Sequence, residues 1–394
     1  PGALTGHRLA VGCCIIFFAI SFIVVYSQLS RFEFKHLSKD QLAFILGGLF
    51  FLVLWLIELS VKRPGFPLIM LFTASASYLF LLYFAIAHVP LISLPSEPYS
   101  LYYTVIDRFM IGLDPYQVYD TFHDHPFTAL PGHWLSYLPI KLFEIDPRWV
   151  GGLAYLVSIL LLYLAAPSNR KHLASYGLSL FILIPSLQLA EYQAIGLNPL
   201  MMALICFLLV KDLNLFAVAV LGLSLSISLV YWLLIPFIIG YLLAHRPLRF
   251  WLFYLALLLI FGGLLLLPFF TLSPDTFFYC TIGFWFETYL WNGPSITFWL
   301  IDFIGDYGLL FIQGFFLLFI TGQFLGSEKS LAAAYMSFSV SLLFFTIVNR
   351  VSEVTFLPLI ALSAIAGYIV SEGEYKLIPP VRIFQRTVSG QEIA

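Results

Sequence analysis

Charged side chains are scarce in this sequence. Of its 394 residues, only 10% are Asp, Glu, Lys or Arg, whereas 61% are apolar, and the mean hydropathy is +0.96. Water-soluble globular domains carry about a quarter charged residues, so the composition excludes a protein of that class. The formal net charge of −2 gives no sign of a nucleic-acid partner, and we expect none.

Cysteines are also few in the sequence, and it has no N-glycosylation sequon. The four cysteines have no metal-binding spacing, because Cys13 and Cys14 are adjacent in one apolar run and Cys206 lies in another. Cys280 stands alone in a polar loop, so we expect no disulfide framework. None of the five asparagines lies in an N-x-Ser/Thr sequon, which disfavours a lumenal eukaryotic surface.

Long apolar runs, in contrast, recur along nearly the whole chain. A helix needs about 20 apolar residues to cross a bilayer, and we predict an all-α polytopic membrane protein with about twelve such helices. The predicted spans are residues 9–28, 41–61, 66–88, 149–166, 173–190, 196–210, 214–228, 230–244, 250–270, 303–323, 331–348 and 353–371. No small-residue cleavage site follows the first run, so we interpret it as a retained helix. The closely joined spans 214–228 and 230–244 leave one long or broken helix as an alternative.

Two polar segments are too long for simple turns. Residues 89–148 and 271–302 contain Pro, Gly, Trp and Tyr, as is typical of segments at a membrane interface. Within the first segment, residues 129–143 form a short apolar stretch interrupted by prolines, which we interpret as a juxtamembrane helix on the membrane surface. We expect the two segments to meet over one cavity on the same face of the membrane.

The distribution of charge gives an orientation. If residues 129–143 do not cross the membrane, 12 of the 19 Lys and Arg residues fall on one face, which we assign to the cytoplasm together with both termini. About 15 of the 21 Asp and Glu residues fall on the opposite, outer face, although acidic residues have little influence on insertion. We therefore expect any chemistry on the outer face, and we expect the plasma membrane of a prokaryote rather than the endoplasmic reticulum.

Residues 97–134 carry the densest set of polar and titratable side chains. The apolar spacing predicts a short amphipathic helix over residues 99–111, ended by Gly112 and followed by a turn. Asp107 lies on this helix one turn from Tyr103. A carboxylate among aromatic side chains at a membrane surface can have a raised pKa and act as a general base, and a solvated acid with no such role is the alternative.

Five short motifs occur in an order that resembles the GT-C glycosyltransferases, and especially their mannosyltransferase branch, which use polyprenyl-phosphate sugars. The motifs are the turn Gly112-Leu-Asp-Pro-Tyr116, residues 129–140, residues 191–198, residues 292–295 and residues 349–358. The resemblance covers residues 66–371, with external loops at 89–148 and 271–302. Residues 1–65 then form an additional N-terminal transmembrane hairpin, and residues 372–394 form a cytoplasmic tail.

The resemblance implies an enzyme that moves a sugar from a polyprenyl-phosphate donor to a lipid, glycan or protein acceptor. Two carboxylates remain alternatives for its catalytic base: Glu97 matches the family by its spacing before the glycine turn, and Asp107 matches by its local surroundings. The expected substrate-binding residues are Arg108, Asp120, His123, Asp124, His125, His133, Gln193, Arg350 and Glu353. Arg350 suits a phosphate because a guanidinium makes bidentate contacts, and an ion pair with Glu353 is the alternative.

Several other interpretations stay open. We expect no cofactor, and His123 with His125 leaves a divalent metal as the alternative, although this i,i+2 spacing does not suit one helix face. A catalytically silent accessory subunit, with protein partners in a membrane complex, is another alternative. It is favoured because Asp107 lies closer to the glycine turn than the family's catalytic acid, and because residues 221–237 carry no charge. A lipid-linked flippase or transporter is disfavoured because the sequence shows no internal repeat. The expected partners are a polyprenyl-phosphate sugar and membrane lipids.

Overall fold

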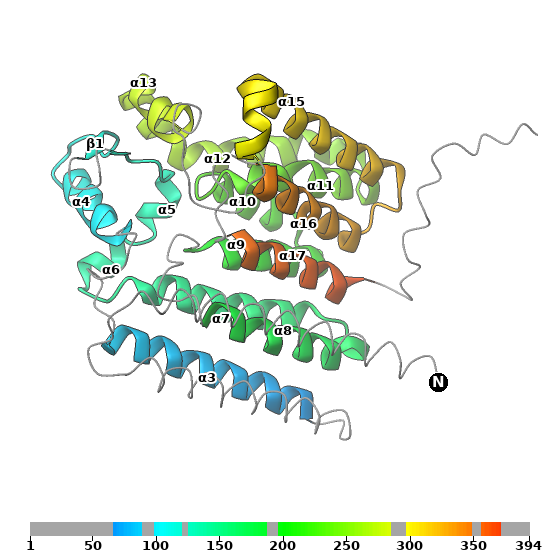
Figure 1. The fold of residues 1–394 in the computed structure, drawn as a ribbon. Helices are drawn as coiled ribbons and strands as arrows, with labels where there is room; N and C mark the ends of the chain where they lie inside the picture. Colours follow the sequence, from blue (N-terminus) through cyan, green and yellow to red (C-terminus); the bar gives the residue numbers. More distant parts are fainter. Residues whose placement is uncertain are drawn as a thin grey trace, which may run out of the picture.

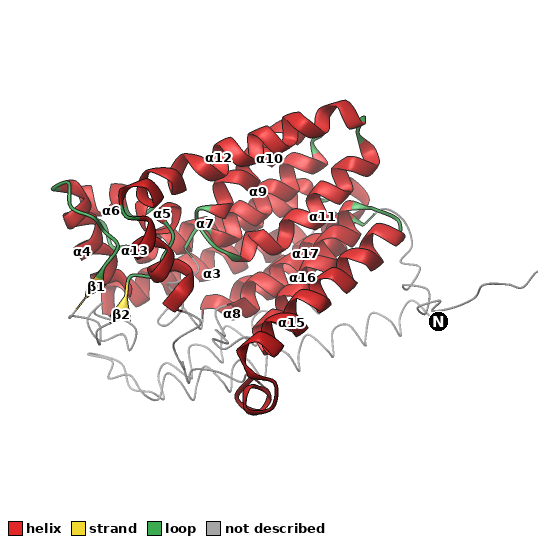
Figure 2. Cartoon of the chain, turned by 90° about the horizontal axis from the view of Figure 1, so that it is seen from above, coloured by secondary structure: helices red, strands yellow, loops and turns green. Residues whose placement is uncertain are grey.

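The structure, a computed structural model, describes residues 66–88, 98–119, 125–186, 196–284, 297–348 and 356–371. The predicted spans 9–28 and 41–61 and the tail 372–394 lie outside these residues. The described part is almost entirely helical. Its long helices lie side by side and nearly parallel, and a group of short elements covers one end of this bundle (Figures 1 and 2).

The bundle consists of α3 (Phe66–His88), α7 (Arg148–Ala165), α8 (Lys171–Ser186), α9 (Asn198–Val210), α10 (Asn214–Leu225), α11 (Val230–His245), α12 (Trp251–Leu272), α15 (Thr297–Gly326), α16 (Leu331–Val348) and α17 (Leu357–Val370). Short 3-10 turns precede α8 and α12, namely η3 (Ser168–Arg170) and η5 (Leu248–Phe250).

The elements at one end of the bundle form what we call the outer module, after the face predicted for them from the sequence, and this placement stays a prediction. It consists of α4 (Pro98–Met110), the antiparallel strands β1 (Val118–Tyr119) and β2 (His125–Pro126), α5 (Pro131–Leu135), α6 (Leu138–Leu142), α13 (Pro274–Phe278) and the π-helical turn η6 (Tyr279–Gly283). The stretch at 129–143 thus folds as two short helices. Five helical residues extend only about 7.5 Å, so neither helix crosses a bilayer.

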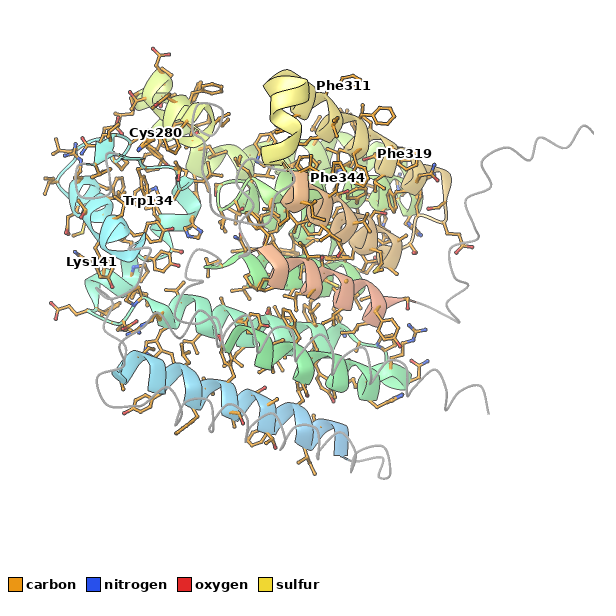
Figure 3. The ribbon with its side chains drawn as sticks, viewed as in Figure 1. Trp134, Lys141, Cys280, Phe311, Phe319 and Phe344 are labelled. Carbon is orange, nitrogen blue, oxygen red and sulfur yellow. The ribbon has the colours of Figure 1, made fainter. Side chains whose placement is uncertain are left out.

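Four described helical stretches are long and apolar enough to cross a membrane: residues 148–165, 251–272, 308–326 and 331–348. The outward faces of these helices are also apolar, and exposed side chains such as Leu259, Phe311 and Phe319 cover them (Figure 3). Apolar faces of this extent are unfavourable in water and are satisfied by lipid chains. These features are consistent with an integral membrane protein, and the count of twelve spans stays a prediction.

Within the described residues, each predicted span falls on a helix of the bundle. Residues 66–88 and 331–348 coincide with α3 and α16, and residues 214–228 and 230–244 form two separate helices, α10 and α11. The main difference is in α15, which begins at Thr297 and is broken at Gly305, where φ is 64° and ψ is −179°. Only glycine adopts this conformation readily. Because of this break, the first turns of α15 point in a different direction from the rest of the helix (Figure 2).

Small residues allow the bundle helices to approach closely. A Cβ atom on Gly222 of α10 would lie 2.9 Å from the main-chain oxygen of Leu258 and 3.2 Å from the main-chain nitrogen of Gly262, both on α12. Glycine is typical of helix contacts in membranes, because packing replaces the hydrophobic effect there. Hydrogen bonds from side chains to main-chain carbonyls also join the bundle helices, such as those from Tyr335 to Met202 (3.0 Å) and from Tyr155 to Phe181 (3.0 Å).

The described loops that are predicted to share the basic face, those after α7, α9, α11 and α15, gather at the end of the bundle opposite the outer module (Figure 1). Arg170 donates a hydrogen bond to the carbonyl of Tyr368 (3.2 Å), and Arg246 forms an ion pair with Asp212. Lys329 lines a surface hollow here. We call this the basic end, and its assignment to the cytoplasm stays a prediction.

Candidate functional site: the outer module

Helix α4 sets the geometry of the outer module. Leu101, Val105 and Ile106 are buried on one of its faces, which confirms the amphipathic helix predicted over 99–111. Gly112 ends the helix with φ of +78°, a left-handed conformation that glycine adopts without strain. The chain then turns back, because the N–H of Leu113 donates to the carbonyl of Arg108 (3.0 Å).

Trp134 lies at the centre of an aromatic core that joins the two polar segments. It is fully buried, and its ring packs against Phe269 at a centroid distance of 5.5 Å. Its Nε1–H donates to the hydroxyl of Tyr116 (3.3 Å), and the Tyr116 ring contacts Phe277 edge-to-face at 4.8 Å. Cys280 is buried against the same core (Figure 3), and burial raises the pKa of its thiol to about 11, so the thiol stays protonated.

Asp114 makes the polar connection between the same segments. Its carboxylate accepts a hydrogen bond from the Ser273 hydroxyl and another from the N–H of Tyr116 (2.9 Å). Arg108, an expected substrate-binding residue, donates through Nε to the carbonyl of Asp114 (3.2 Å). The expected contact between segments 89–148 and 271–302 is therefore confirmed for the described residues, which meet through packed aromatic rings, and a cavity between the segments stays a prediction.

Asp107 points to the surface of the module, where it pairs with a residue that the sequence did not indicate. Its Oδ2 atom lies 2.8 Å from Nζ of Lys141, at the end of α6. The same ammonium lies 4.7 Å from the centroid of the Tyr103 ring. The Asp107 side chain is 59% exposed and that of Lys141 is 28% exposed. An ion pair this exposed contributes about 0–1 kcal/mol to stability. The pair of Asp107 and Lys141 therefore adds little to the stability of the fold.

Exposed apolar side chains flank this pair. Met110 and Ile111 follow Asp107 by three and four residues, and therefore lie on the same side of α4. Leu142 and Phe143 follow Lys141 directly, and all four side chains are more than half exposed. We call these four residues the apolar rim. Its amphiphilic character, an ion pair between apolar side chains, is typical of surfaces that contact lipid.

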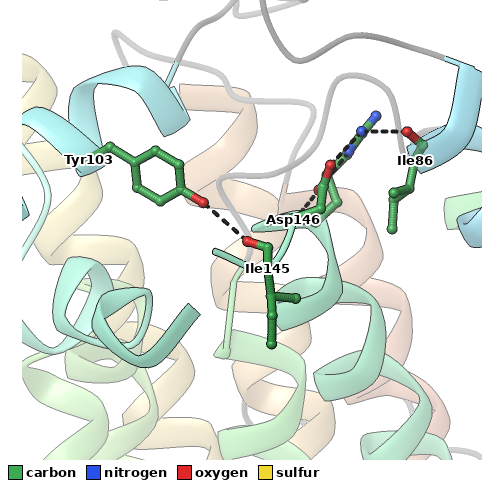
Figure 4. Close-up of polar contacts among 5 residues, drawn as sticks. Ile86, Tyr103, Ile145 and Asp146 are labelled. Carbon is green, nitrogen blue, oxygen red and sulfur yellow. Dashed lines mark hydrogen bonds and ion pairs between the residues drawn. The ribbon is translucent and has the colours of Figure 1, made fainter. Parts of the chain in front are cut away.

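The apolar rim is held close to the start of a membrane-spanning helix. The hydroxyl of Tyr103 donates to the carbonyl of Ile145 (3.3 Å), which fixes α4 to the segment between α6 and α7 (Figure 4). Arg148, the first residue of α7, forms a buried ion pair with Asp146 (2.6 Å) and donates to the carbonyl of Ile86 at the end of α3 (3.1 Å). The rim therefore lies a few residues from the outer end of a candidate span.

His133 is buried where the outer module meets the bundle. Its ring lies between those of Tyr102 and Tyr137, with centroid distances of 5.4 and 5.8 Å, and only 4% of the residue is exposed. Its Nε2 atom is buried and has no hydrogen-bond partner among the described residues. Burial lowers the pKa of the imidazole to about 4, so His133 is neutral near pH 7. In this conformation a substrate does not reach it.

The remaining expected site residues are only partly placed. The main chain of His125 lies in β2, opposite Tyr119. The others lie outside the described residues: Glu97, Asp120, His123, Asp124, Gln193, Arg350 and Glu353. The structure thus brings together Asp107, Lys141 and Tyr103, and the roles of the other residues stay predictions.

No protein-family model, curated protein or solved structure matches the chain. Any functional assignment therefore rests on the residues and their geometry.

Proposed function

We propose that the chain is an integral membrane glycosyltransferase that takes a sugar from a polyprenyl-phosphate donor at the outer face of a prokaryotic plasma membrane. The observation that carries this proposal is the pair of Asp107 and Lys141 beside the apolar rim. The donor has a long apolar tail, a phosphate and a sugar. An apolar surface, a cation and a carboxylate are the matching groups, and all three occur together at the outer end of the bundle.

In the proposed reaction, the acceptor hydroxyl attacks the anomeric carbon of the sugar. The bond from this carbon to the phosphate oxygen breaks, and its electron pair leaves with the polyprenyl phosphate. Lys141 compensates the charge on the leaving phosphate, and Asp107 accepts the proton of the hydroxyl. Because the donor phosphate competes for the ammonium, its binding releases the Asp107 carboxylate from Lys141 for this role.

A catalytically silent accessory subunit is the second candidate. Two observations favour it: the carboxylate of Asp107 is already paired, and packed aromatic side chains fill the contact around Trp134. In that case, the exposed apolar rim would serve to hold the outer module at the membrane or against a protein partner, and no sugar would be transferred.

Donor turnover distinguishes the two candidates. Membranes containing the protein are supplied with radiolabelled polyprenyl-phosphate mannose, glucose or galactose, and label leaving the donor is counted. We expect Asp107→Asn to slow transfer by about 10²–10⁴-fold, because a positioned base contributes that much. We expect Lys141→Met to raise the KM for the donor.

Two controls complete this experiment. Glu144→Gln changes an exposed carboxylate in the same neighbourhood and should leave turnover unchanged. Glu97→Gln tests the alternative base, and a severe loss there with an active Asp107→Asn would assign the base to Glu97. If no donor is consumed above the level of membranes without the protein, the chain is a silent accessory subunit and the proposal of an enzyme is wrong.

A further inference from the structure

We infer that acid opens the contact between the outer module and the bundle, because this contact encloses the imidazole of His133 away from water. We call this contact the seam and define it by His133, Tyr102 and Tyr137 on the module and Gly196 and Ser226 on the bundle. The inference does not depend on the proposed sugar transfer.

Two glycines allow the seam to close tightly. Gly196 has φ of +46°, and a Cβ atom there would lie 2.8 Å from Cε1 of His133 and 3.2 Å from the Tyr137 hydroxyl. On the module, the N–H of Gly132 donates to the carbonyl of Ser226 (2.8 Å), and a Cβ on this glycine would lie 3.0 Å from the carbonyl carbon of Ser226. The imidazole is therefore enclosed between backbone on one side and two tyrosine rings on the other.

No described acidic group faces His133. The neighbouring titratable groups are the hydroxyls of Tyr102 on α4 and Tyr137 before α6. The charged residues of these helices make their contacts elsewhere, since Asp107 pairs with Lys141 and Arg108 donates to a main-chain carbonyl. Helices α9 and α10 contain no charged residue. An imidazolium at this position would thus be a buried charge without compensation, which is strongly unfavourable.

Even the neutral imidazole of His133 lacks part of its hydrogen bonding in the closed seam. Nε2 has no hydrogen-bond partner among the described residues, and an unsatisfied buried polar atom destabilises the state that buries it. Opening the seam returns this nitrogen to water. The closed state is therefore stable enough to form with a neutral ring and is poorly suited to a charged one.

The sign of the pH dependence follows from proton linkage. The closed seam lowers the pKa of His133 from its usual 6.5 to about 4, so the open state binds more protons between these values. The closed state has its full stability above about pH 6.5 and loses stability as the pH falls toward 4. Relative to pH 7, the opening constant rises about 20-fold at pH 5 and about 200-fold well below pH 4.

Hydrogen exchange of the full chain in lipid nanodiscs measures this opening. After correction for the intrinsic exchange rates, we expect a peptide covering residues 131–137 to lose about 20-fold in protection at Gly132, whose N–H donates across the seam to Ser226, between pH 7 and pH 5. A peptide from α12 should keep its protection. In His133→Phe, which keeps a ring and removes the titration, the 131–137 peptide should show no such loss.

Two outcomes would overturn the inference: unchanged wild-type protection at pH 5, or an equal loss in His133→Phe. If the Phe variant does not fold, His133→Gln provides the same comparison. Gly196→Ala supplies a second check on location, because its Cβ would meet the imidazole. This variant should lower the protection of residues 131–137 already at neutral pH, and unchanged protection there would contradict the proposed seam.

Discussion

Large aromatic side chains are buried both in the outer module and in the bundle, for example Trp134 in the module and Tyr231 in the bundle, but the two regions differ in how closely their main chains approach. In the module, large side chains such as Trp134 and Tyr116 are fully buried and hydrogen-bonded to one another. In the bundle, α10 and α12 approach so closely that a Cβ on Gly222 would nearly touch the opposing backbone. The difference follows from the solvent, because lipid offers no hydrogen-bond partners and little hydrophobic driving force between helices.

This comparison indicates where chemistry is placed. The bundle has an apolar exterior that suits lipid, whereas the module presents a carboxylate and an ammonium 2.8 Å apart at its surface. The groups that we propose to react therefore lie in the outer module. The two regions should then respond to different substitutions.

The largest effect is expected for Trp134→Ala in the module. Removal of a buried indole should lower the free energy of unfolding by about 3–5 kcal/mol, because it leaves a cavity in the aromatic core. Hydrogen exchange should show the loss in α4 to α6, while the bundle helices stay protected. Trp232→Ala is the matched control, because this tryptophan is half exposed on α11. Equal effects of the two substitutions would remove the distinction between the regions.

A smaller effect is expected for Gly222→Ala in the bundle. The added methyl meets the carbonyl of Leu258 and should destabilise the bundle by about 1–3 kcal/mol through overpacking. Gly314→Ala in α15 is the control, because a Cβ there meets nothing within 4 Å. Thermal unfolding of the purified protein in detergent compares the two variants. A Gly222→Ala protein as stable as Gly314→Ala would show that close backbone approach does not hold α10 to α12.

The sequence predicted the regular parts of this fold well. The spans 66–88 and 331–348 coincide with α3 and α16, since the length of an apolar run follows directly from the thickness of the bilayer. The helix end at Gly112 was also predictable, because a glycine after an amphipathic pattern is a local signal. The break of α15 at Gly305 was not, since several glycines in the same helix do not break it.

The site was less predictable, because its contacts are not local. Lys141 is 34 residues from Asp107, and no spacing in the sequence connects them. His133 was expected to bind substrate, and its enclosure by Tyr102, Tyr137 and Gly196 shows it to be buried. Burial and long-range pairing depend on tertiary contacts, and these cannot be inferred from local patterns in a single sequence.

The central claim is that the outer module and the basic end lie on opposite sides of one membrane. Asp275 in α13 and Ser168 in η3 are exposed, and α13 lies at the opposite end of the bundle from the turn between α7 and α8 (Figure 1). With the four native cysteines replaced by alanine, Asp275→Cys and Ser168→Cys are treated with a membrane-impermeant maleimide in intact cells and after permeabilisation. We predict that Asp275→Cys reacts in intact cells and that Ser168→Cys reacts only after permeabilisation. Reaction of both cysteines from the same side would contradict the claim.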